Sequence, residues 1–254
     1  MNLSPCIEWH FSDSEDLADR LRAAAKAGFA RAEFHLWRDK PMTEIGAALA
    51  ETGVSLTGIC VDPRRSIVDP AQHEELFAAV RESIEGCKVI GSPPMIVASG
   101  FIREGVSAQE HFEQAVTALK TIAAMAQDAG VILLLEPLND RIDHPGMYLV
   151  STTLGLDLIE AVGSPNLRLL YDVYHSRVMG EDMAEVLKGR MHLVHHVQVA
   201  DYPGRNEPGT GTIDWTEVIA TLKRLGYQGD IGLEYRPTMP IEASLAKSRE
   251  ALGV

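Results

Sequence analysis

The chain has 254 residues, of which 46% are hydrophobic, and it carries a formal net charge of −13. A chain of this length folds as one barrel-sized domain or as two ordinary domains. The negative charge argues against a protein that follows the nucleic-acid backbone, which needs a basic face, and against binding to anionic membranes.

Short apolar runs alternate with helical patterns along the whole chain. In chain order, the strand-like runs cover residues 6–11, 30–36, 55–62, 93–100, 131–139, 167–175, 194–201 and 230–237. Between them, apolar residues recur at spacings of three and four, which predicts helices such as 12–28, 70–91 and 107–130. We expect Ser12 or Asp13 to start the first helix, and a last helix over about 240–252.

Eight strand–helix units predict an α/β fold in which parallel strands close into a (β/α)8 barrel. We expect a single domain over residues 1–254, because no linker or change in composition divides the chain. The alternative fold is a doubly wound open sheet. The absence of a glycine-rich nucleotide fingerprint after the first strand weakens that alternative.

The cysteines and the hydropathy pattern bear on location. Cys6, Cys60 and Cys87 are scattered and form no CxxC motif, which disfavours a disulfide framework or a structural zinc site. No start resembling a signal peptide and no apolar run long enough to span a bilayer is present. These features predict a cytoplasmic protein without a membrane partner.

Four polar residues lie where the last four strand-like runs end: Glu136, Asp172, Gln198 and Glu234. In a barrel the carboxyl ends of the strands share one face. Buried acids and amides are costly without a partner, so this set suggests a shared cation. Ligation by oxygen alone suits Mg²⁺ or Mn²⁺ better than Zn²⁺. The alternative for any one of them is a carboxylate at a loop edge that pairs with Arg or Lys.

Four segments resemble the signature segments of the hydroxypyruvate isomerase family: LLLEPLNDRIDHPG, LLYDVYH, VQVADYPGRNEPGTGTIDW and GLEYRP. That family belongs to the xylose isomerase-like barrel superfamily. The similarity covers roughly 130–240, and the first half of the chain agrees mainly in its strand–helix rhythm. One departure is Arg236, which stands where the family usually has Lys.

The resemblance implies a divalent metal ion, Mg²⁺ or Mn²⁺, bound by Glu136, Asp172, Gln198 and Glu234. Glu136 and Glu234 would also be the catalytic pair that moves a proton between adjacent carbons through an enediolate. His175 and Arg205 would bind the substrate. The residue-level alternatives are a strand-end histidine satisfied by backbone for His175, and a surface arginine paired with Glu207 or Asp201 for Arg205. We interpret His195 and His196 as structural, with His196 on the same strand face as Gln198.

The implied activity is isomerisation of a small hydroxy-oxo acid, either hydroxypyruvate to tartronate semialdehyde or a slightly longer acid such as 2-oxotetronate. Its partner would be this small molecule, and a homo-oligomer is a family-based expectation. The alternatives are a ketose 3-epimerase, a 3-dehydroshikimate dehydratase and a barrel without enzymatic activity. Gln198 disfavours the epimerase, which usually has His at that position. The acidic composition disfavours an endonuclease acting at abasic DNA sites.

Overall fold

Eight parallel strands form one sheet in the order β1-β8-β7-β6-β5-β4-β3-β2 in the computed structural model, which describes residues 1–253. The strands are β1 Leu3–Pro5, β2 Arg31–Glu33, β3 Ser55–Cys60, β4 Met95–Val97, β5 Leu133–Leu135, β6 Leu167–Asp172, β7 Val194–Val199 and β8 Ile231–Leu233. A parallel bridge between Cys6 and Glu33 joins the two ends of the sheet. The prediction of a TIM barrel is confirmed; the last residue of the predicted domain, Val254, lies outside the described residues.

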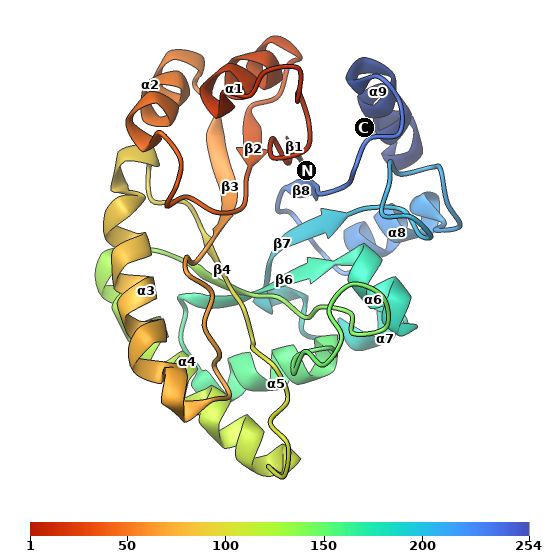
Figure 1. Ribbon diagram of the computed structural model, residues 1–254. Coiled ribbons are helices and arrows are strands. Elements are labelled where there is room, and N and C mark those ends of the chain that lie inside the picture. The colour runs from red at the N-terminus through yellow and green to blue at the C-terminus, as the bar shows by residue number, and fades with distance from the viewer. Residues whose placement is uncertain (254) are drawn as a thin grey trace.

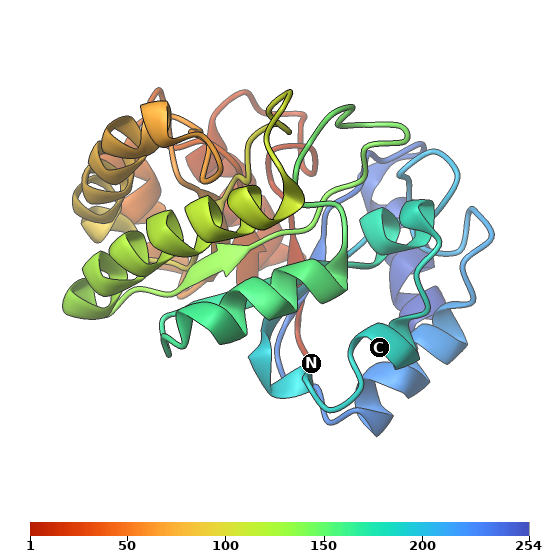
Figure 2. The same cartoon turned by 90° about the horizontal axis from the view of Figure 1, so that it is seen from below.

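Helices surround the strands and cover the outside of the sheet (Figure 1). They are α1 Leu17–Lys26, α2 Met42–Thr52, α3 His73–Gly86, α4 Ala108–Ala129, α5 Thr152–Val162, α6 Val173–Met179, α7 Met183–Val186, α8 Trp215–Arg224 and α9 Ile241–Leu252. Several helices that follow one another in sequence pack side by side, as α4 and α5 do in Figure 2. Within residues 1–253, no helix combines the length and apolar character needed to cross a bilayer.

Helix α4 illustrates how the sequence pattern produces this packing. Its buried positions include Ala115, Leu119, Ile122 and Ala126, spaced alternately by four and three residues. This spacing puts all four side chains on one face of the helix. Ser107 accepts a hydrogen bond from a backbone N–H of the first turn, and Gly130 ends the helix in the left-handed region.

Most of the strands are shorter than the predicted ranges, and the first strand and the first helix also begin elsewhere. The first strand covers Leu3–Pro5 and not 6–11, because the N–H groups of Trp9 and His10 donate to the Cys6 carbonyl and turn the chain away from the sheet. Helix α1 starts at Leu17 and not near Ser12, because the Asp16 side chain caps it.

The sixth strand is also shorter than the predicted range 167–175. It ends at Asp172, whose side chain accepts hydrogen bonds from the N–H groups of Tyr174 and His175 and so starts α6. His175 is therefore in the first turn of a helix and not at the end of a strand. This short helix fixes the direction of both Asp172 and His175.

Candidate active site

A cavity of about 360 Å³ opens at the carboxyl ends of the strands. Its walls include four of the six residues selected from the sequence: Glu136, His175, Arg205 and Glu234. Asp172 and Gln198 lie deeper and are almost fully buried. They are register partners across β6 and β7, and Gln198 is paired on its other side with Gly232 of β8. The structure thus gathers all six residues at one end of the barrel.

Asp172 is 2% exposed, and its two carboxylate oxygens have different environments. Oδ1 accepts the two hydrogen bonds that cap α6, at 2.7 and 3.2 Å. Oδ2 is buried and has no hydrogen-bond partner. It lies 3.7 Å from His175 Nε2 and 3.8 Å from Arg205 Nη2. One oxygen is used by the fold and the other is available to a ligand.

Gln198 shows the same division. Its Nε2 donates to Glu33 Oε1 at 2.8 Å. Its Oε1 is buried without a partner. A buried acceptor without a donor costs roughly 1–3 kcal/mol, so such groups in native proteins usually have a ligand or an ordered water. Gln198 Oε1 and Asp172 Oδ2 therefore form an acceptor-rich position that suits a hard cation.

Glu136, Asp172 and His175 each offer an atom within 4.8 Å of the others, so distance alone would also allow His175 as a metal ligand. Its hydrogen bonds argue otherwise. Asn139 Oδ1 accepts from the N–H groups of Ile142 and Asp143, both at 3.0 Å, which orients its amide. Asn139 Nδ2 and the Asn139 backbone N–H then both donate to His175 Nδ1, at 2.7 and 3.1 Å. The ring proton of a neutral His175 is consequently on Nε2, which becomes a donor.

The His175 ring is neutral at ordinary pH. Burial and the charge of the neighbouring Arg205 guanidinium together lower its pKa to about 3. The Nε2 atom is buried without a hydrogen-bond partner, 3.9 Å from Glu136 Oε1. A neutral donor thus points toward the carboxylates and can serve a substrate oxygen between them.

Arg205 is the cation among these acids. Its Nη2 lies 2.5 Å from Glu234 Oε2, so it pairs with Glu234 and not with Glu207 or Asp201. The guanidinium carbon is 5.6 Å from the centre of the Trp9 ring and 5.2 Å from that of Tyr174. The backbone at Arg205 has φ of 56°, a left-handed conformation that the surrounding loop must hold in place.

Asp201 holds this loop. Its carboxylate accepts hydrogen bonds from the backbone N–H groups of Gly209 and Ile213, at 2.7 and 3.2 Å. It also accepts one from Trp215 Nε1 at 2.9 Å. The segment that carries Arg205 is thereby tied to the start of α8.

The two glutamates have opposite pKa shifts. Burial raises the pKa of Glu136 well above its usual value, and the charges of Glu234 and Asp172 raise it further. Burial would also raise the pKa of Glu234, but Arg205 and a hydrogen bond with His35 outweigh it and hold it low. His35 Nε2 is 2.9 Å from Glu234 Oε1. The site therefore distinguishes the two carboxyl groups electrostatically.

Sequence reasoning missed Glu33 and Arg64 at this site. Glu33 contacts Gln198, and His35, near the end of the second strand-like run, contacts Glu234. Both belong to the run 30–36, where alternation puts residues 33 and 35 on the same face, so a buried acid in that run was the available signal. Arg64, after β3, also lines the cavity. Its place in the cavity wall depends on barrel closure, which no local pattern shows.

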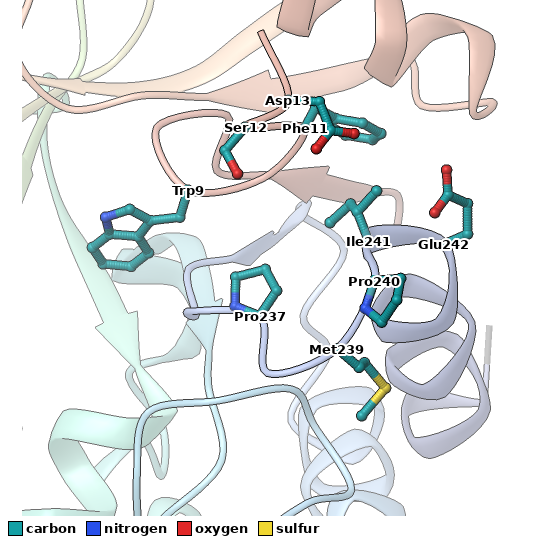
Figure 3. A pocket seen from close by; sticks show the side chains of 9 residues that line it. All are labelled: Trp9, Phe11, Ser12, Asp13, Pro237, Met239, Pro240, Ile241 and Glu242. Carbon is teal, nitrogen blue, oxygen red and sulfur yellow. The ribbon is translucent and has the colours of Figure 1, made fainter. Parts of the chain in front are cut away.

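A second hollow of about 300 Å³ lies between the segment before α1 and the start of α9 (Figure 3). Its walls include Trp9, which also borders the larger cavity, and the carboxylates of Asp13 and Glu242. None of the six residues selected from the sequence lines it. We therefore assign the chemistry to the larger cavity.

The family model "Xylose isomerase-like TIM barrel" matches residues 21–252, and the chain belongs to this family. Over 91% of its length it is 30% identical to hydroxypyruvate isomerase of Escherichia coli K12, covering 92% of that protein. Over 92% it is 29% identical to 2-oxo-tetronate isomerase of Cupriavidus necator, covering 93%. A solved structure described as AP endonuclease, family 2, from Brucella melitensis superimposes with a TM-score of 0.89 at 25% identity, covering 97% of each chain. The two isomerases, which this chain matches over nearly their full length, identify the chain as an isomerase.

Proposed function

We propose that this isomerase interconverts the aldehyde and ketone forms of a small hydroxy-oxo acid with the help of a bound divalent cation. Hydroxypyruvate and tartronate semialdehyde, or 2-oxotetronate, are the proposed substrates, as the names of the two relatives suggest. The observation that carries the proposal is the pair of buried, unpartnered oxygens of Asp172 and Gln198 beside Glu136 and Glu234.

The donor set fits a hard cation. Three carboxylates and one amide oxygen would hold it: Glu136, Asp172, Gln198 and Glu234. All four offer oxygen, which favours Mg²⁺ or Mn²⁺. When bound, such a cation stabilises the negative charge that develops on the substrate oxygens. The His175 nitrogen stays outside the set, because its Nε2 carries the proton.

Glu136 and Glu234 are the proposed proton-transfer pair. Both line the cavity in which the substrate would lie. Isomerisation needs one carboxylate to take a proton from a carbon and a group that returns a proton to the adjacent carbon. In the protein without metal the pKa of Glu136 is raised and that of Glu234 is lowered, so the two carboxyl groups differ before the cation binds. Because the reaction runs in both directions, the two residues exchange roles.

His175 is the proposed donor to a substrate oxygen. Its Nε2–H lies 3.7 Å from Asp172 Oδ2 and 3.9 Å from Glu136 Oε1, which is beyond hydrogen-bond length for both. A substrate hydroxyl or carbonyl oxygen placed between these groups would receive the hydrogen bond. A neutral donor helps here, because it stabilises the enediolate without adding a second positive charge that competes for the carboxylates.

Two guanidinium groups in the cavity wall favour an acidic substrate over a neutral sugar. Arg64 and Arg236 line the cavity, and neither forms a salt bridge within residues 1–253. Arg236 is held against Trp9, with its guanidinium carbon 5.2 Å from the ring centre. We propose that one or both bind the substrate carboxylate, which a neutral ketose lacks.

We also propose a cellular location and a class of partner for this protein. We propose a reducing cytoplasm, since all three cysteines are buried and free. A small-molecule partner and no nucleic acid agree with the net charge of −13, although the structural relative carries an endonuclease name. A single domain and a homo-oligomer stay predictions from the sequence.

The test is turnover of hydroxypyruvate by Mn²⁺-loaded protein, compared with Glu136→Gln and Glu234→Gln. Each variant should lower kcat by about 10²–10⁴-fold, because each removes a proton carrier. Glu185→Gln, an exposed glutamate outside the cavity, is the control and should keep full activity. Full turnover in either cavity variant would remove the assigned pair.

A substrate panel separates the alternatives. We expect Arg236→Met and Arg64→Met to raise KM for hydroxypyruvate and to leave kcat closer to the wild-type value. Epimerisation of a neutral ketose at a higher kcat/KM than that for hydroxypyruvate would favour the ketose 3-epimerase. Formation of an ultraviolet-absorbing aromatic product from 3-dehydroshikimate would favour the dehydratase.

A further inference from the structure

We infer that Glu33 is a positioning residue: it holds the Gln198 amide so that the amide oxygen, and not the nitrogen, faces the metal site. Glu33 is the last residue of β2 and is 3% exposed. Gln198 is in β7, 165 residues further along the chain. The inference rests on the proposed metal site and adds a residue that does not itself contact the cation or the substrate.

Both oxygens of Glu33 accept hydrogen bonds. Oε1 accepts from Gln198 Nε2 at 2.8 Å. Oε2 lies 2.8 Å from His196 Nε2 and accepts from Thr57 Oγ1 at 3.1 Å. Thr57 Oγ1 is in turn 2.6 Å from Ser4 Oγ. A network from four different strands therefore fixes the carboxylate, which is the condition for fixing a second group through it.

The Glu33 carboxylate decides which way the Gln198 amide points. An amide has an oxygen acceptor on one side and an NH₂ donor on the other, and the two sides have nearly the same shape. A carboxylate only accepts, so the NH₂ group must face Glu33 and Oε1 must face the opposite direction. In the flipped orientation two oxygens would meet at Glu33 and the NH₂ group would face the cation. The charge also polarises the amide and makes Oε1 a better ligand.

Gly232 provides the space for this arrangement. A Cβ atom at Gly232 would lie 2.6 and 2.7 Å from the two Glu33 oxygens and 2.8 Å from His196 Nε2. Gly232 is also the register partner of Gln198 across β7 and β8. The missing side chain on β8 lets Glu33 reach from β2 through the barrel interior to β7. The buried acid therefore occupies a place that the neighbouring strand leaves open.

The test measures Mn²⁺ affinity by calorimetric titration of folded, metal-free protein. Glu33→Gln keeps the shape of the side chain and allows the Gln198 amide to flip. It should weaken Mn²⁺ binding by about 10–100-fold. In a Gln198→Ala background the same substitution should have no further effect, because Glu33 acts through Gln198. Glu181→Gln is the matched control: Glu181 also accepts several hydrogen bonds, from Thr152 and Ser176, but it does not line the larger cavity. It should keep wild-type affinity.

Three outcomes would overturn the inference. In the first, Glu33→Gln lowers the stability of the metal-free protein but leaves Mn²⁺ affinity unchanged, as a purely structural role requires. In the second, the affinity falls equally with and without Gln198. In the third, wild-type protein binds no Mn²⁺, which also removes the proposed metal site. If Glu33→Gln does not fold, Glu33→Asp replaces it: this variant keeps the charge but withdraws it from Gln198, and it too should bind Mn²⁺ more weakly.

Discussion

Arg205 offers the sharpest test of the electrostatics of the site. It is the cation nearest to Glu234 and Asp172 in the protein without metal. Burial would lower its own pKa, but the charges of these acids outweigh burial and raise it. Arg205→Met removes the charge and keeps much of the volume. The side chains of Arg205, Glu234 and Asp172 are 15%, 10% and 1% exposed, so solvent screens them little.

The expected loss of stability of Arg205→Met follows from this burial. Removing one partner of a buried ion pair leaves an uncompensated charge and typically costs about 3–5 kcal/mol. We expect Arg205→Met to lower the free energy of unfolding by this amount in EDTA. In saturating Mn²⁺ the cation compensates the same carboxylates, so most of the difference from wild-type protein should disappear. Arg205→Lys keeps the charge and should lose less than the Met variant.

The assay is urea unfolding followed by circular dichroism, with and without Mn²⁺. Arg190→Met is the matched control, because Arg190 pairs with Asp157 and Glu160 on the exposed outer surface. This control should lower the free energy of unfolding far less than Arg205→Met does, and the decrease should be the same with and without Mn²⁺. The reasoning fails if Arg205→Met is as mild as the control in EDTA, or if its cost is the same with and without Mn²⁺.

Two further predictions concern protons and the loop. Burial, partly opposed by Arg205, raises the pKa of Asp172 to about 7, and that of Glu136 is also raised. Because Mn²⁺ needs these carboxylates deprotonated, its affinity should fall about tenfold per pH unit below about 7 for each proton displaced, and calorimetry should detect proton release. Equal affinities at about pH 5.5 and 7.5 would contradict this. Asp201→Asn should lower stability by about 1–3 kcal/mol, since its NH₂ group would face the N–H donors of Gly209 and Trp215, and should raise KM through the loop that carries Arg205. Unchanged unfolding and KM would argue against that role.

The barrel and the oxygen-rich face follow from local features of the sequence. Short apolar runs and helices at a period near 3.6 alternate eight times, and the helical period is set by backbone geometry alone. Glu136, Asp172, Gln198 and Glu234 could be selected because each lies where such a run ends. Their meeting then needs no contact information, since parallel strands put their carboxyl ends on one face.

Element boundaries were less predictable, because side chains compete with the backbone pattern. The run 167–175 reads as one strand, yet the Asp172 carboxylate satisfies two N–H groups and starts a helix three residues before His175. The Asp16 side chain moves the start of α1 for the same reason. Whether such a side chain caps depends on where it can point, and the apolar period does not report this.

Only the tertiary structure decided how each functional side chain is oriented and which of its atoms face the cavity. Glu33 and Gln198 are separated by 165 residues, and barrel closure brings one to the nitrogen of the other. Asn139 lies in the loop after β5, and its hydrogen bond to His175 determines which nitrogen of His175 carries the proton. The sequence by itself determined which residue types stand at the strand ends. Hydrogen bonds between strands far apart in sequence decided which atoms are left free, because an atom is available to a ligand only when no neighbour in space has already bound it.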